Sequence, residues 1–151
     1  IEFKGIVPRE MRKHIGNRVY GCDDCLSVCP WNKFAQENNE IRLKSRDDFD
    51  MPDLSSFIDL DEGGFADLFS NSPIKRIGRD RFIRNILIGM GNSEEKKYIP
   101  LISNKLRDKS SIVRATAIWA IKQLCSSTEM EYFKTKSIKS EKDKLVLKEW
   151  N

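Results

Sequence analysis

The sequence predicts a mostly α-helical protein built in two parts. Three of its four cysteines fall within eight residues near the start, which indicates a compact metal- or cluster-binding unit. Farther along, apolar residues recur at helical spacing in several successive stretches. Between these parts lies an acidic stretch, residues 47–62, which contains Pro52 and is followed by two glycines. We therefore place a boundary near residue 50 and expect domains of residues 1–50 and 51–151.

Composition narrows the class of protein. The 151 residues are 39% apolar and 33% charged, too apolar for a disordered chain and too polar for a membrane protein. No apolar run approaches the length of a membrane span. The net charge of +4 is a mild basic excess. The chain begins at Ile1 with neither an initiator methionine nor a signal pattern, so we expect a piece of a longer protein.

Four helices are expected after the boundary, each from apolar residues three and four positions apart. They centre on Phe65 to Phe69, Phe82 to Met90, Tyr98 to Leu106, and Val113 to Leu124. Pro100 is expected to shift the start of the third helix, and Ser110 or Ser111 to cap the fourth. A last segment, Glu129 to Trp150, is rich in lysine and expected to be helical in places.

Two of these helices resemble each other. Phe82-Ile83-Arg84 aligns with Ile112-Val113-Arg114 at a spacing of 30 residues. That length fits one helix pair of a helical repeat, although chance similarity is the alternative for barely two copies.

The cysteines form the pattern Cys22-x2-Cys25-x3-Cys29-Pro30. This matches the last three cysteines and the proline of the bacterial ferredoxin run. Soft thiolate donors suit iron–sulfur clusters. If the pattern holds, Cys22 and Cys25 serve one cubane, Cys29 serves a second, and the remaining five ligands lie outside this chain.

Two other interpretations of the cysteines stay open. His14, the only histidine, could complete a Cys3His zinc site with the same three cysteines, although the x3 spacing and the Cys-Pro ending favour iron and sulfur. Plain buried cysteines are the third interpretation. Cys125 ends an apolar helical stripe, and for it a free buried thiol is expected.

A basic stretch precedes the second predicted helix. Residues 73–84 hold five cations, which are Lys75, Arg76, Arg79, Arg81 and Arg84, against Asp80 alone. Such a cluster is typical of a phosphate-binding edge, and we favour RNA binding for Lys75, Arg76 and Arg79. For Arg84 and Arg114 we favour pairing with an acid of a neighbouring turn. Trp31 is a candidate stacking platform for a base, or else packs over the cluster ligands.

The motif GNRVYGCDDCLSVCPWNKFA, residues 16–35, closely resembles the second cluster motif of the epoxyqueuosine reductase family. The opening IEFKGIVP and the stretch SPIKRIGRDRFIRNILIGMGN are also similar to segments of that family. The resemblance covers most of residues 1–125, whereas residues 126–151 match nothing we can name.

The resemblance implies a cobalamin-binding domain, a ferredoxin-like domain with two [4Fe-4S] clusters, and a C-terminal domain of HEAT-like repeats. It implies reduction of epoxyqueuosine to queuosine at the wobble position of transfer RNA. Electrons pass through the clusters to cobalamin, whose cobalt attacks the epoxide while an acidic residue protonates the oxygen. This chain would be the C-terminal portion, the end of the ferredoxin-like domain followed by the HEAT-like domain, and inactive by itself with no catalytic residue of its own.

The resemblance also assigns roles to individual residues. It implies cluster ligation by Cys22, Cys25 and Cys29. It implies contact of Asp23 and Asp24 with the corrin, for which a solvated turn is the alternative. Phe3 and Lys4 would lie at the mouth of the active site. The implied partner is a transfer RNA anticodon stem-loop, with no membrane partner; we expect a cytoplasmic monomer, and the resemblance names no electron donor.

Two rival functions follow from the same residues. One is a helical-repeat module that binds RNA or protein and carries a structural zinc. The other is a different corrinoid iron–sulfur reductase, such as a reductive dehalogenase, against which the basic stretch of residues 75–84 argues. Metal content separates the first rival from the iron–sulfur interpretation.

Overall fold

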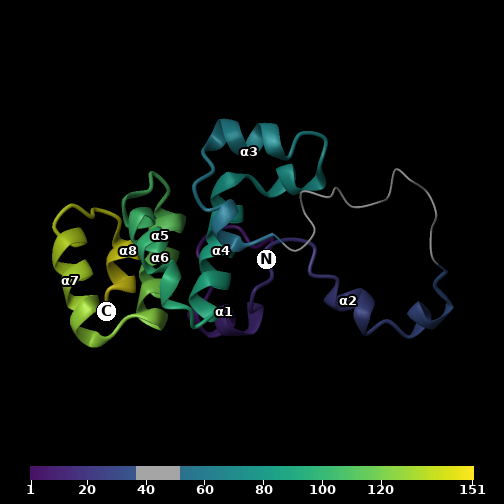
Figure 1. The fold of residues 1–151 in the computed structure, drawn as a ribbon, viewed down its shortest axis with the longest axis horizontal. Coiled ribbons are helices and arrows are strands. Elements are labelled where there is room, and N and C mark those ends of the chain that lie inside the picture. The colour runs from purple at the N-terminus through teal and green to yellow at the C-terminus, as the bar shows by residue number, and fades with distance from the viewer. Residues whose placement is uncertain (37–51) are drawn as a thin grey trace.

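The computed structural model describes residues 1–36 and 52–151, and within these ranges every regular element is a helix. The prediction of a mostly α-helical chain is therefore confirmed. The boundary predicted near residue 50 lies outside the described residues. In Figure 1 the helices α3 to α8 and α1 form a packed body, and the segment with α2 extends to one side.

The first part of the chain forms three short elements that the sequence did not predict. They are α1 (Arg9–Ile15), α2 (Asp24–Ser27) and the 3₁₀ helix η1 (Pro30–Phe34). Pro8 precedes α1, and Gly16, with a φ of 62°, ends it. A left-handed residue at this position is a common helix stop and favours glycine.

The second part contains the four predicted helices and the helical C-terminal segment. In order they are η4 (Leu54–Ser56), α3 (Glu62–Leu68), η5 (Pro73–Ile77), α4 (Arg79–Asn92), η6 (Lys96–Tyr98), α5 (Ile99–Asn104), η7 (Lys105–Arg107), α6 (Ser111–Leu124), α7 (Ser127–Ser137) and α8 (Lys144–Glu149). Pro100 stands in the first turn of α5, which confirms the shifted start.

The predicted caps are partly right. Ser110 is the N-cap residue of α6, but its side chain makes no capping hydrogen bond. Its backbone N–H instead donates to Asp108 Oδ1 at 2.9 Å. A complete capping box starts α7, where Ser126 and Glu129 each accept from the other's backbone N–H.

The core lies where α4 crosses α6, and both are 14 residues long. Most of α4 is buried, and the isoleucines and the leucine of its apolar stripe have no exposed surface. Gly91 permits the crossing, because a Cβ there would lie 2.8 Å from the Trp119 ring and 3.0 Å from Ala120 Cα. Four phenylalanines of the η4, α3 and α4 region pack together near the start of α4. The ring centroids of Phe69 and Phe82 are 4.9 Å apart.

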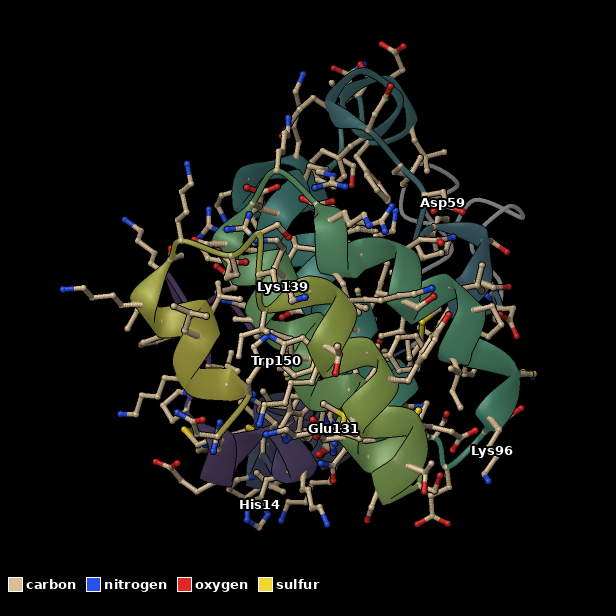
Figure 2. The ribbon with its side chains drawn as sticks, turned by 90° about the vertical axis from the view of Figure 1, so that its left-hand side faces the viewer. His14, Asp59, Lys96, Glu131, Lys139 and Trp150 are labelled. Atoms are coloured by element: carbon tan, nitrogen blue, oxygen red, sulfur yellow. The ribbon has the colours of Figure 1, made fainter. Side chains whose placement is uncertain are left out.

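The first and last helices meet on this core. Arg12 of α1 is 1% exposed, and its guanidinium donates two hydrogen bonds to the Glu149 carboxylate of α8, at 2.7 and 3.1 Å. Its Nε donates to the Val7 carbonyl at 2.8 Å. Trp150, beside Glu149, is buried and is labelled in Figure 2. Hydrogen bonds thus join α1, near the start of the chain, to α8, near its end.

Candidate iron–sulfur and nucleic-acid site

The cysteine loop is set by two left-handed residues and one short helix. Gly21 has a φ of 57° and Asp23 a φ of 50°. The Asp23 carbonyl accepts from the N–H groups of Leu26 and Ser27, both at 2.9 Å, which winds α2. Cys25 lies in α2, while Cys22 precedes α2 and Cys29 is the N-cap residue of η1, just before Pro30. The three cysteines therefore lie in one tight loop, and the proline restricts the backbone where the chain leaves that loop.

The thiols fit iron–sulfur ligation. Cys22, Cys25 and Cys29 are free thiols, the first two exposed and the third half-buried. Cys125 is also free and half-buried, and burial raises the pKa of its thiol, as expected for an inert cysteine. Three unpaired, accessible sulfurs in one loop are suitable donors for clusters.

A single zinc ion is a poorer fit. Within residues 1–36 and 52–151, no three histidine, cysteine or acidic side chains converge to hold one metal ion. A Cys3His site needs that convergence, and His14 is exposed on α1, at the lower edge of Figure 2. Donation to two separate clusters, as in the ferredoxin pattern, does not require Cys29 to converge with the other two cysteines.

The two acids in the loop differ in their surroundings. Asp24 pairs with Arg18, with Nε and Oδ2 2.9 Å apart and both side chains partly exposed. Asp23 is exposed, and among the described residues its carboxylate has no ion-pair partner. Asp23 is therefore the freer of the two to contact a group that lies over the loop.

Apolar side chains stand exposed beside the thiols. Val28 is 80% exposed and Trp31 75%, and Leu26 and Phe34 are also exposed. The Trp31 and Phe34 rings lie 5.8 Å apart, and the Lys33 ammonium lies over the Phe34 ring. An apolar face of this kind marks an interaction surface.

The segment predicted at the active-site mouth lies against α4. The Phe3 and Lys4 side chains are exposed, whereas the carbonyls of Ile1, Phe3 and Gly5 accept hydrogen bonds from Arg84. Backbone inside and side chains outside is the arrangement that a contact role for Phe3 and Lys4 requires.

Part of the basic stretch reaches the same segment. Arg76 pairs with Glu2 at 2.6 Å, and this hydrogen bond raises the pKa of the Arg76 guanidinium. Arg81 donates to the Glu2 carbonyl at 3.4 Å, and Lys75 is exposed. The predicted phosphate-binding edge and the predicted mouth are therefore neighbours.

Arg79 forms a buried ion pair inside the helical part. Its side chain is 6% exposed, and it donates to both Asp108 oxygens, at 2.9 and 2.6 Å, and to the Leu60 carbonyl. The Asp108 hydrogen bond raises the pKa of Arg79, so its charge is permanently present but already neutralised. We correct the expectation that it contacts RNA, because its guanidinium has no exposed face for a phosphate.

The two arginines at the repeat spacing behave differently. Arg114 pairs with Glu141 at 2.7 Å, as expected for pairing with an acid. Arg84 was expected to do the same, and that expectation is wrong, since it binds backbone carbonyls and the Asn85 side chain. Burial, followed by the nearby Arg81 cation, lowers the pKa of Arg84 to about 10.

An open cleft of about 1000 Å³ lies between the loop after α1, η4 and α4. Tyr20, Phe82 and Tyr98 line it, and the Asp53 carboxylate accepts from the Tyr98 hydroxyl at 3.2 Å. Glu95 lines it as well. Two carboxylates on its lining disfavour an RNA phosphate, so the cleft is not part of the nucleic-acid edge.

Sequence reasoning missed Asn85 and Asn92, whose side-chain amides bind backbone carbonyls of the cysteine-bearing part. A signal was present, because both are polar residues within residues 82–92, a stretch whose other members except Arg84 are apolar residues and glycines. Such residues in a buried helix need hydrogen-bond partners.

Comparison with known proteins agrees with this site. The profile of a family described as a 4Fe-4S double cluster binding domain matches residues 1–32. The epoxyqueuosine reductase of Xanthomonas campestris is 41% identical over 124 residues, which are 82% of this chain and 35% of that protein. That of Pseudomonas aeruginosa is 36% identical over 124 residues, 82% of this chain and 34% of that protein. This chain thus spans about a third of the length of these relatives.

A solved structure of epoxyqueuosine reductase with a tRNA-Tyr epoxyqueuosine-modified stem loop matches with a TM-score of 0.88 and 27% identity. The match covers 99% of this chain and 40% of the other. A double-cluster cysteine loop followed by a packed group of helices defines the class of protein, which is an iron–sulfur protein with a helical extension. The chain belongs to the epoxyqueuosine reductase family.

Proposed function

We propose that this chain is the C-terminal portion of an enzyme that reduces epoxyqueuosine to queuosine at the wobble position of transfer RNA. The observation that carries the proposal is the loop of free thiols at Cys22, Cys25 and Cys29, within the stretch that matches the double-cluster family. The chain has the length of only about a third of its relatives, so it would be inactive alone.

The chain's own residues would hold and orient the redox groups. Cys22 and Cys25 would bind one [4Fe-4S] cluster and Cys29 the other. Asp23, with its free carboxylate, and Asp24, held by Arg18, would face cobalamin. When bound, these groups supply the electrons for opening the epoxide. Phe3 and Lys4 would line the mouth through which the modified nucleotide enters.

The helical part would bind the RNA. Arg76 and Arg81 contact Glu2, next to Phe3 and Lys4, and the exposed Lys75 precedes Arg76 in the sequence, so an RNA backbone held on this edge is close to the mouth. The solved relative that carries a tRNA stem loop supports a transfer RNA anticodon as partner. We assign α4 to α6 to HEAT-like repeats, because two 14-residue helices pack together with related sequences.

We further propose that the enzyme is a cytoplasmic monomer without a membrane partner. In residues 1–36 and 52–151, no helix has the length and apolar content needed to cross a bilayer.

Metal content and turnover test the redox role. The chain, joined to the rest of a family member, is reconstituted without oxygen and assayed on epoxyqueuosine-containing transfer RNA. We expect about eight iron atoms and turnover, as two [4Fe-4S] clusters require. Cys25→Ser should abolish turnover, whereas the matched change Cys125→Ser should leave it intact. Zinc in place of iron would support the binding module, and clusters without turnover would support another corrinoid reductase.

Salt dependence of RNA binding tests the basic edge. Lys75→Ala and Arg81→Ala should each weaken binding of the stem-loop and reduce the slope of log affinity against log salt by about 0.7 to 0.9. Lys139→Ala, on the exposed C-terminal side labelled in Figure 2, is the control and should change neither. Equal effects of all three changes would mean that binding follows net charge and not this edge.

A further inference from the structure

Helix α4 carries a cation, Arg84, whose side chain is fully buried. Arg84 has no exposed surface, and it donates to the carbonyls of Ile1, Phe3 and Gly5 at 2.6, 2.6 and 2.7 Å. Among the described residues it forms no ion pair, unlike Arg79 and Arg114 in the same part of the chain. Burying an unpaired charge is costly unless its donors are fully used.

Asn85 extends this arrangement to the cysteine loop. Its Oδ1 accepts from Arg84 Nε and Nη2, at 3.1 and 2.9 Å. Its Nδ2 donates to the Ile1 carbonyl at 3.0 Å and to the Val19 carbonyl at 2.7 Å. Val19 is three residues before Cys22. One buried Arg–Asn pair therefore holds the backbone on both sides of α1.

The carbonyls in question lack other backbone partners. Within the described ranges, those of Ile1, Phe3, Gly5 and Val19 accept no backbone hydrogen bond. Asn92, the last residue of α4, likewise donates to the carbonyls of Arg12 and Gly16, both at 2.9 Å. Side chains of α4 thus donate to this irregular segment the hydrogen bonds that the backbone of a neighbouring strand would donate in a sheet.

We propose that Arg84 and Asn85 are positioning residues that fix the cysteine loop and the Phe3–Lys4 segment relative to one another through their backbone carbonyls. This inference deepens the proposed function, on which its role in the reaction rests. It gives the helical part a second task besides RNA binding, which is to hold the cluster ligands.

Backbone ¹⁵N relaxation of this chain, measured by nuclear magnetic resonance, reports the positioning directly. Arg84→Met and Asn85→Leu should lower the order parameters of residues 2–6 and 18–21 from about 0.85, typical of rigid backbone, to below about 0.6, since each change removes hydrogen bonds that order that backbone. Arg114→Met is the matched control, because it removes a similar guanidinium held by Glu141 and by the carbonyls of Asp108 and Lys109. It should leave the order parameters of residues 2–6 and 18–21 unchanged.

Spectroscopy of the reconstituted full-length enzyme tests the consequence for the clusters. We expect Arg84→Met and Asn85→Leu to shift or broaden the electron paramagnetic resonance signals of the reduced clusters, with Arg114→Met unchanged. Arg84→Lys keeps the charge but cannot reach three carbonyls, so it should resemble Arg84→Met. If Arg84→Met does not fold, Asn85→Leu and Arg84→Lys decide the question.

Unchanged order parameters and unchanged signals in the variants would overturn the proposal. So would equal effects of Arg114→Met, which would indicate general loosening of the helices. Failure of the proposed function is separate, because it shows as absent turnover in the unaltered enzyme. The order parameters and the resonance signals can still be compared there.

Discussion

At the scale of single residues, the buried ion pair between Arg12 and Glu149 joins α1 to α8. Both side chains are nearly buried, and two parallel hydrogen bonds join them. The Arg12 guanidinium also lies over the Trp119 ring at 5.6 Å. Removing one member of such a pair leaves the other charge buried without compensation, which costs about 3–5 kcal/mol.

Glu149→Gln should therefore lower the free energy of unfolding by about 3 kcal/mol at neutral pH, as measured by urea denaturation. The loss should depend on pH. Burial alone would raise the pKa of Glu149, but the hydrogen bond and charge of Arg12 outweigh it and lower that pKa. A carboxyl with a lowered pKa stabilises the fold above its ordinary pKa, about 4.3, and ceases to do so as the pH falls through its folded value.

The difference between the unaltered chain and Glu149→Gln should thus be full above about pH 5 and shrink as the pH falls below about 4. Glu131→Gln, on the exposed side of α7 labelled in Figure 2, is the control and should have little effect at any pH. A stability difference independent of pH would show that the carboxylate charge is not what stabilises this contact.

At the scale of elements, the α4–α6 crossing depends on one small residue. Gly91→Ala places a methyl group 2.8 Å from the Trp119 ring and 3.0 Å from Ala120 Cα, and backbone atoms cannot give way easily. We expect a loss of about 1–3 kcal/mol of unfolding free energy in thermal or chemical denaturation. Gly63→Ala in α3 meets only the Asp61 side chain at 3.7 Å, and it should stabilise slightly through helix propensity. Equal effects of the two changes would contradict a packing role for Gly91.

The helices were predictable because their signal is local. The apolar stripes of α3, α4 and α6 repeat at three and four residues, and each helix formed where its stripe lies. The short α1 has a single buried side chain, Arg12, so no apolar stripe announced it. Its position depends on α4 and α8, which follow it by more than sixty residues.

The cysteines of the candidate site could also be predicted from local sequence, whereas the state of its basic residues could not. Cys22, Cys25 and Cys29 were identified from spacing within one loop, where local geometry decides the outcome. Arg79 was misjudged, because its partner Asp108 is 29 residues away and nothing near Arg79 indicates that pair. Composition can locate a basic stretch, but only the packing shows which cations are already neutralised.

At the scale of the whole molecule, the last segment of the chain supports the first. The sequence of residues 126–151 indicated only a lysine-rich, partly helical segment, yet α8 packs on α6, and Val146 and Trp150 are buried there. Lys122 of α6 donates to the Glu149 carbonyl at 2.6 Å, and Arg9 joins Arg12 on the Glu149 carboxylate. The cysteine-bearing segment is thus held by α4 on one side and by α8 on another.

Removal of residues 138–151 tests this dependence. The truncated chain loses the buried side chains of α8 and leaves Arg12 without its carboxylate, so we expect its melting temperature to fall by about 10 °C or more. Amide exchange should rise in residues 7–15 as well as in α6, because α1 loses the partner of its buried cation. Removal of Asn151 alone, which is exposed, is the control and should alter neither. A truncated chain that melts like the intact one, with α1 still protected, would show that α4 alone holds the start of the chain.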